Sequence, residues 1–145
     1  MLYLLDKYMD VVTDHSIIFF DGICNLCNGF VDFVIKRDHK RRFRYASLQG
    51  DQSRTLLDFK DDSDVQNMST VILLDQGKVY KKSKAVIKIL KQLGKGWYVL
   101  SFFMSIIPSS FSNMIYDFIA ARRYRILGKR ETCRIPTEAE ASLFL

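Results

Sequence analysis

The residues with the clearest chemistry in this chain are two cysteines separated by two residues, Cys24 and Cys27. They follow a short apolar run at 17–20 and open a segment with helical periodicity, so the pair stands where a strand passes into a helix. A thiol at a helix N-terminus sees the positive end of the helix dipole, which favours the thiolate. The three-residue offset also brings the second sulfur close enough to the first for a disulfide. The pattern predicts a redox-active dithiol.

Their positions on the predicted helix give the two cysteines different roles. Cys24 precedes the first turn, so we expect it to be exposed and to act as the nucleophile in thiol–disulfide exchange. Cys27 shares an apolar face with Val31 and Val34, so we expect it to be shielded and to act as the resolving thiol. Asp21, three residues before Cys24, is the third candidate catalytic residue. It either takes the proton from Cys27 during resolution or hydrogen-bonds the N–H groups of its own loop.

A third cysteine and two histidines leave a metal site open as an alternative. A structural zinc ion needs four nitrogen or sulfur ligands, and the chain offers Cys24, Cys27 and Cys133 with either His15 or His39. The favoured prediction contains no metal and no cofactor. In it Cys133 is an ordinary surface or half-buried thiol, while a role as a third redox partner stays open.

Length and composition set the class of protein. The chain has 145 residues, 48% hydrophobic and 26% charged, which excludes a disordered chain and a membrane bundle and predicts one globular domain. Three cysteines, an odd number, argue against an extracellular disulfide framework. The N-terminus lacks a basic start and a small-residue cleavage site, so we expect a cytoplasmic protein with reduced thiols. The longest apolar stretch, 97–107, is shorter than the about 20 residues that cross a bilayer.

The net charge of +6 raises the question of an acidic partner. Basic residues cluster at 36–42 and 122–134, and such clusters bind phosphate in some proteins. The first cluster follows a helical pattern, where cations complement the C-terminal dipole, so we expect no nucleic-acid partner. Arg122 interrupts an apolar helix face and should reach solvent or a carboxylate, with an anion or a thiolate as the alternative.

Apolar patterns predict the element order β-α-β-α-β-β-α. Strands are expected at 17–20, 43–48, 70–74 and 78–80, the last two joined by a compact turn at 75–77. Helices are expected at 24–37, at 51–59 and from Ser83, taken as the N-cap, to Gly94.

Two further helices, at 98–107 and 110–127, and a short one opened by Thr137 should form an extension packed on the same core. The helix at 110–127 is expected to pack on the core through one apolar face, which contains Phe111, Ile115, Phe118, Ile119 and Ile126. Residues 1–145 are therefore expected to form a single domain, with a core of about 15–95 and an extension of about 96–145.

The stretch 19–31, Phe-Phe-Asp-Gly-Ile-Cys-Asn-Leu-Cys-Asn-Gly-Phe-Val, closely resembles the DCC family of predicted thiol-disulfide oxidoreductases. The family is named for an Asp and two Cys, which fall on Asp21, Cys24 and Cys27. Further similarity covers nearly the whole chain, at residues 36–38, 43–46, 83–85, 123–124, 128, 133 and 136. The resemblance implies a thioredoxin-like three-layer α/β sandwich with a C-terminal helical extension. It also implies exchange with a protein or small-molecule disulfide and an external electron donor.

One position departs from that pattern. Thioredoxin-like redox proteins usually place a cis-proline before the third strand, opposite the cysteine pair, where its backbone pairs with substrate. Here that position falls at 68–70, and the prolines of the chain are Pro108 and Pro136. Ser69 or Thr70 would have to present the backbone edge instead. A non-catalytic module, which uses the basic and aromatic C-terminal helices against an acidic partner or a membrane surface, is the less favoured interpretation.

Overall fold

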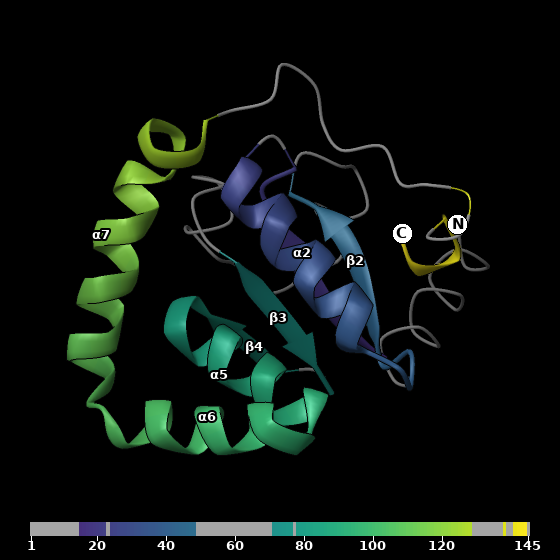
Figure 1. The fold of residues 1–145 in the computed structure, drawn as a ribbon, viewed down its shortest axis with the longest axis horizontal. Helices are drawn as coiled ribbons and strands as arrows, with labels where there is room; N and C mark the ends of the chain where they lie inside the picture. Colours follow the sequence, from purple (N-terminus) through teal and green to yellow (C-terminus); the bar gives the residue numbers. More distant parts are fainter. Residues whose placement is uncertain are drawn as a thin grey trace.

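The computed structural model of the chain describes residues 15–22, 24–48, 71–76, 78–128, 138 and 141–144. They contain a four-stranded mixed sheet in the order β2-β1-β3-β4 (Figure 1). The strands are β1 (Ser16–Phe20), β2 (Phe43–Ser47), β3 (Ile72–Asp75) and β4 (Lys78–Lys81). β2 is parallel to β1, whereas β3 is antiparallel to both β1 and β4. The four predicted strands and the hairpin are confirmed, with ends that shift by one or two residues.

The described helices are α2 (Asn25–Arg37), α5 (Lys82–Leu93), α6 (Lys95–Ile106) and α7 (Ser109–Leu127), and a 3-10 turn, η1, spans Ala141–Leu143. α2 joins the parallel strands β1 and β2. Its end is fixed by Asp38, whose carboxylate accepts hydrogen bonds from the N–H groups of Arg42 and Phe43 at 3.1 and 3.0 Å. This turn leads the chain into the register in which Ser16 pairs with Phe43. The helix expected at 51–59 lies outside the described residues.

The core lies on both faces of the sheet. On one face α2 and α5 cover every second strand residue, and the cluster includes Ile18, Phe20, Phe43, Tyr45, Leu73, Val31, Val34, Ala85 and Ile89. On the other face a second buried cluster contains Ile17, Phe19, Ala46, Leu48, Ile72 and Leu74. Side chains alternate across a strand, so burial on both faces requires the continuous apolar runs seen in β1 and β3.

The start of α5 differs from the prediction. Ser83 is not the N-cap: the helix begins at Lys82, and the N-cap is Lys81 in an extended conformation. Ser83 is instead buried, and its hydroxyl donates to the side-chain oxygen of Asn113 at 2.6 Å. The hydroxyl therefore ties α5 to α7 instead of capping its own helix. Gly94 follows the helix end with φ +73°, as predicted for a C-terminal glycine.

α6 and α7 form an L along the outside of the molecule (Figure 1). Both helices were predicted, but the expected burial of the apolar face of α7 is wrong. Four of its five named residues, Phe111, Ile115, Phe118 and Ile119, are 42–58% exposed. The reason is that α7 packs through another stripe, which contains Asn113, Tyr116 and Ala120 and is half-buried. The fifth, Ile126, has no described side chain.

The described C-terminal residues return to the sheet beside β2. Leu143 is buried, and Phe144 makes a parallel bridge with Tyr45. The ring of Phe144 lies 5.4 Å from that of Tyr45 and 6.2 Å from that of Phe20. The helix expected to open at Thr137 falls on residues that are mostly outside the description. The described fold is α/β, with a four-stranded mixed sheet and four helices, and it is consistent with a thioredoxin-like architecture.

Candidate redox site

The cysteine pair lies at the junction of β1 and α2, as the sequence predicted. β1 ends at Phe20, and Cys24 is the N-cap of α2 with an extended backbone, φ −83° and ψ 124°. Cys27 follows in the first turn of the helix, and both residues carry thiols rather than a shared disulfide. The first turn of a helix presents backbone N–H groups and the positive dipole end, which stabilise a thiolate placed there.

The exposure expected for Cys24 is wrong in this structure. Cys24 is 0% exposed and Cys27 is 7% exposed, and both belong to the core cluster on the helix-covered face of the sheet. The shielding of Cys27 beside Val31 and Val34 is confirmed. Position before the first turn does not guarantee contact with solvent, because Asp21 and Gly22, which follow β1, are themselves buried. The Cys24 side chain is therefore closed to solvent in this conformation.

Asn28 holds the loop in place, and the sequence analysis did not single it out. Its side-chain amide donates to the carbonyl oxygens of Gly22 at 2.8 Å and Cys24 at 2.9 Å. Its backbone N–H also donates to the Cys24 carbonyl, at 3.0 Å. Asn28 is 1% exposed, next to Cys27 on the core side of the helix. A polar residue at a core position of an apolar face was the available signal, since buried polar groups are hydrogen-bonded.

The end of α7 reaches the start of α2 through Gly128. The N–H of Asn25 donates to the carbonyl of Gly128 at 3.4 Å. Gly128 has φ +85°, and a Cβ at this position would lie 3.2 Å from the side-chain nitrogen of Asn25. A glycine is therefore favoured on both conformational and steric grounds. One of the orphan donors of the α2 N-terminus is satisfied by a residue more than a hundred positions away.

A small apolar cavity of about 180 Å³ borders Cys27 between α2, α5 and α7. Its lining comprises Leu26, Cys27, Phe30, Val71, Val86, Tyr116, Ile119 and Ala120. The Tyr116 hydroxyl accepts a hydrogen bond from the Val71 N–H at 2.8 Å, and the Val71 carbonyl accepts one from Lys82. The backbone of Val71 is thus engaged within the protein, while Ser69 and Thr70 lie outside the described residues. The cavity has the size and polarity for a small apolar group next to the sulfur of Cys27.

Two other candidates occupy distinct settings. Asp21 is 1% exposed, and its backbone carbonyl accepts the N–H of Cys24 at 3.3 Å, so this acidic residue belongs to the loop that carries the pair. A buried carboxylate in such a place is a candidate for proton transfer. Arg122 is exposed, and its guanidinium lies 3.9 Å from the centre of the Phe118 ring. The exposure agrees with the expectation that this long basic side chain reaches solvent, and the contact with the Phe118 ring adds to it.

The geometry disfavours the zinc site with a histidine ligand. His39 lies beyond the C-terminal end of α2, where Arg37 is already about 15 Å along the helix axis from Cys27 at 1.5 Å per residue. His15 precedes β1, so it lies at the opposite end of that strand from the cysteines, about 17 Å away from Phe20. Zinc–ligand bonds are about 2 Å long, so neither histidine can join the pair on one ion. Within the described ranges no group of three His, Cys, Asp or Glu could hold a metal, and Cys133 lies outside them.

Comparisons with known proteins give a family match and two relatives. The family profile of DCC1-like thiol-disulfide oxidoreductases matches residues 18–129, which include the cysteine pair and Gly128. The chain is 36% identical to the uncharacterized protein YuxK of Bacillus subtilis, over 90% of the chain and 94% of that protein. It is 34% identical to a chloroplastic DCC family protein of Arabidopsis thaliana, over 82% of the chain and 69% of that protein. No solved structure matches it.

Proposed function

Because the chain belongs to the DCC1-like thiol-disulfide oxidoreductase family, we propose that it exchanges disulfides through Cys24 and Cys27. The observation that carries the proposal is the place of the pair, at the N-cap and in the first turn of the helix that follows the first strand. We also propose that the fold is a thioredoxin-like β-α-β-α-β-β-α sandwich. The strand order β2-β1-β3-β4, with α2 and α5 on one face, supports it.

The exchange has two steps. The thiolate of Cys24 attacks one sulfur of a disulfide in a protein or a small molecule, forms a mixed disulfide and releases the other sulfur as a thiolate, which takes up a proton. The thiolate of Cys27 then attacks the Cys24 sulfur, forms the Cys24–Cys27 disulfide and releases the second substrate thiol. The substrate gains two electrons and the pair loses two. An external thiol donor returns them by the reverse chemistry.

Asp21 is proposed as the group that accepts the proton of Cys27 before the second step. Its burial in the loop that carries the pair supports this role, because a carboxylate near a reacting thiol can act as a general base. Asp21→Asn should slow the release of a mixed disulfide by about a hundredfold or more and leave its formation less affected. Asp32→Asn, on α2, is the control. Equal release rates in both variants and the wild type would remove Asp21 from the mechanism.

Reduction of bis(2-hydroxyethyl) disulfide by the full chain, with a dithiol donor, tests the function. Cys24→Ser and Cys27→Ser should each abolish turnover, whereas Cys133→Ser should keep it. Unchanged turnover in both of the first two variants would overturn the proposal.

Trapping of the mixed disulfide tests the roles of the two thiols. Cys27→Ser should accumulate substrate thiol on Cys24, where no second cysteine can release it. Accumulation on Cys27 in the Cys24→Ser variant, with none on Cys24 in the other, would reverse the assigned roles. That result is the one that access through the apolar cavity would give, since Cys27 lines this cavity.

A further inference from the structure

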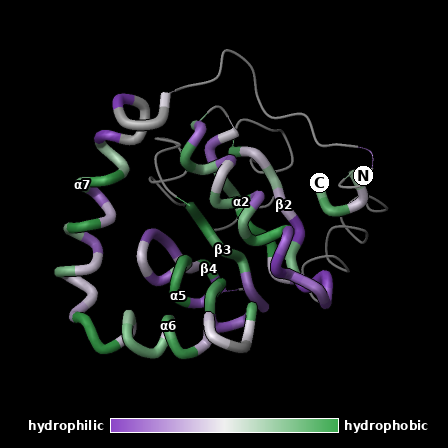
Figure 2. The backbone as a smooth tube through the Cα atoms, viewed as in Figure 1, coloured by the Kyte–Doolittle hydropathy of each residue, from purple (hydrophilic) through white to green (hydrophobic). Residues whose placement is uncertain are grey.

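The large apolar side chains exposed in the described part of the molecule gather on one stretch, 98–119, which we name the apolar arm. Twelve of them are 40–65% exposed: Tyr98, Val99, Leu100, Phe102, Phe103, Ile106, Ile107, Phe111, Met114, Ile115, Phe118 and Ile119. Figure 2 shows the hydrophobic colour along α6 and around its turn into α7. Soluble monomers rarely expose apolar patches of this extent, so the arm points to an apolar partner.

The exposed residues fall in two helical stripes. In α6, Val99, Phe102, Phe103 and Ile106 follow the spacing i, i+3, i+4, i+7, and all four are more than half exposed. In α7, Phe111, Met114, Ile115 and Phe118 repeat the same spacing. Each helix therefore turns one continuous apolar stripe away from the protein body. This is the pattern of a helix that lies on an apolar phase.

The two serine hydroxyls of α6 are satisfied within the helix. The hydroxyl of Ser101 donates to the carbonyl of Tyr98 at 2.7 Å, and that of Ser105 donates to the carbonyl of Phe102 at 2.6 Å. Such bonds to the preceding turn leave the hydroxyl with a partner where water is absent. The helix can therefore enter an apolar layer without losing these hydrogen bonds.

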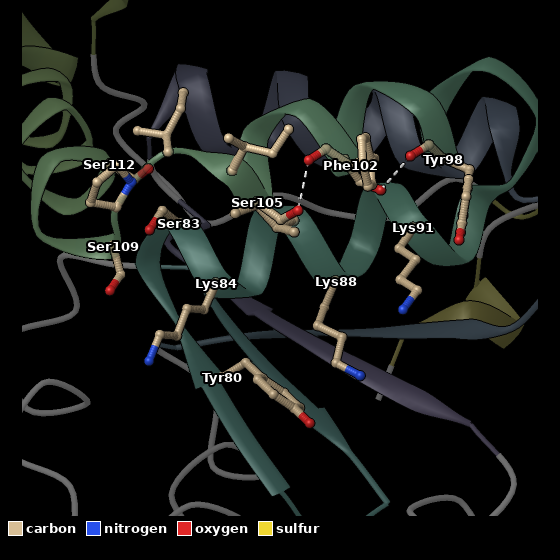
Figure 3. Close-up of a pocket in the computed structure, with 15 residues that line it drawn as sticks. Tyr80, Ser83, Lys84, Lys88, Lys91, Tyr98, Phe102, Ser105, Ser109 and Ser112 are labelled. Atoms are coloured by element: carbon tan, nitrogen blue, oxygen red, sulfur yellow. Dashed lines mark hydrogen bonds between the residues drawn. The ribbon is translucent and has the colours of Figure 1, made fainter.

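Positive charge lies beside the arm. Lys84, Lys88 and Lys91 follow one another along α5 and line one wall of a groove of about 490 Å³, whose other wall is formed by α6 (Figure 3). Phe102 and Ile106 are among the apolar residues of that groove. Residues 95–116 include no acidic side chain, and Asp117 is paired with Lys82 at 3.1 Å. A surface with anionic groups above an apolar layer would therefore find lysine ammonium groups next to apolar side chains here.

The charges favour a bilayer over a second copy of the chain. Two copies joined through this face would bring their lysine rows toward each other, in a protein that already carries +6. Neither α6 nor α7 alone, nor any other single described helix, is long and apolar enough to cross a membrane. Gly96–Ile106 and Ser109–Arg122 meet the criterion only as a pair bent by 109°. A bent pair of this kind suits insertion from one side of the bilayer.

We propose that the apolar arm inserts into the interfacial layer of a membrane that contains anionic phospholipids. The two helical stripes enter the acyl region, and Lys84, Lys88 and Lys91 contact the headgroup phosphates. α7 also provides Tyr116, Ile119 and Ala120 to the cavity beside Cys27, so the bound surface adjoins the redox site. The proposal does not depend on the thiol chemistry: a variant with both Cys24→Ser and Cys27→Ser should bind membranes as the wild type does.

Flotation of the full chain with vesicles tests the proposal. Vesicles of phosphatidylcholine mixed with phosphatidylglycerol should carry the protein to the top of the gradient. Vesicles of phosphatidylcholine alone should carry at least about tenfold less protein. Phe102→Ser with Phe103→Ser should weaken binding more than about tenfold, because each phenyl group loses its transfer to the apolar layer. Both side chains are more than half exposed, so the fold should persist.

Charge variants give the matched control. Lys84→Gln, Lys88→Gln and Lys91→Gln together should reduce binding to the anionic vesicles by about a hundredfold, because each lysine near such a surface contributes about 1 kcal/mol. The same change of charge at Lys36 on α2, Arg41 in the turn after it and Arg44 on β2, the strand at the opposite edge of the sheet from β4, should have a much smaller effect. Equal loss in both triple variants would overturn the proposal. The proposal would also be overturned if the wild type floated with neither kind of vesicle, or if it formed a dimer in solution that Phe102→Ser dissociates.

Discussion

Asn28→Ala removes the side chain that links the helix to the loop of the cysteine pair. In the wild type its amide donates to the carbonyls of Gly22 and Cys24, in a site that is 1% exposed. After the substitution the Cys24 carbonyl keeps the backbone N–H of residue 28 as a donor, so the main loss is the bond to Gly22. The loop at 21–24 then loses its side-chain tether to α2.

The loss in the free energy of unfolding follows from the lost bond to Gly22 and from the carbonyl that is left without this donor. A buried hydrogen bond contributes about 0.5–1.5 kcal/mol, and a buried acceptor that loses its donor costs about 1–3 kcal/mol. We expect a loss of about 2–3 kcal/mol in the free energy of unfolding, or about 5–10 °C in Tm for a chain of this length. If about 2 kcal/mol of this acts on the opening of the loop, the open population rises about 30-fold.

Alkylation of Cys24 reports the opening directly, because its side chain is 0% exposed when the loop is closed. Mass spectrometry of iodoacetamide-treated protein should show Cys24 reacting up to about 30-fold faster in Asn28→Ala. The control is Asn113→Ala, which loses the hydrogen bond from Ser83 at 2.6 Å between α5 and α7. It should cost about 1 kcal/mol and leave Cys24 labelling unchanged. Identical Cys24 labelling rates in the two variants would refute the reasoning.

Other substitutions test the supports of the site and of the sheet. Gly128→Ala and Gly94→Ala both place a side chain at positive φ and should each lower stability by about 1–2 kcal/mol in denaturant titrations. Only the first should also speed Cys24 labelling, because Gly128 contacts the α2 N-terminus. Gly29→Ala should raise stability by about 0.5–1 kcal/mol, since the added methyl of this helical residue meets no atom within 4 Å. Leu143→Ala should cost about 2–3 kcal/mol, and an unchanged Tm would show that η1 does not support β2.

Local sequence patterns predicted α2 and β1. In α2, Cys27, Val31 and Val34 repeat at helical spacing. Their burial on the side of the helix that faces the sheet follows from that spacing alone. The continuous apolar run of β1 likewise requires cover on both faces, and the structure has it. Local patterns of this kind need no knowledge of the rest of the fold.

Other features depend on which segments meet, and a local pattern does not contain that information. Cys24 precedes the helix as expected, but its burial depends on the path of the loop into the core. Ser83 has the side chain of a helix N-cap, yet its hydroxyl donates instead to the side-chain oxygen of Asn113 on α7. α7 carries two stripes, and only tertiary packing decides that the stripe of Tyr116 faces the body while that of Phe118 faces outward. Gly128 could not be linked to Asn25 from spacing at all.

The most direct test of the central claim is a redox titration of the full chain, with the disulfide located by peptide mapping at each potential. Dithiol exchange by this pair predicts one reversible two-electron transition that joins Cys24 to Cys27, at a potential between about −270 and −120 mV, the span from thioredoxin-like reductants to strong oxidants. Cys133 should remain a thiol throughout. A disulfide that joins Cys133 to either residue, or no disulfide between Cys24 and Cys27 at any potential, would contradict it.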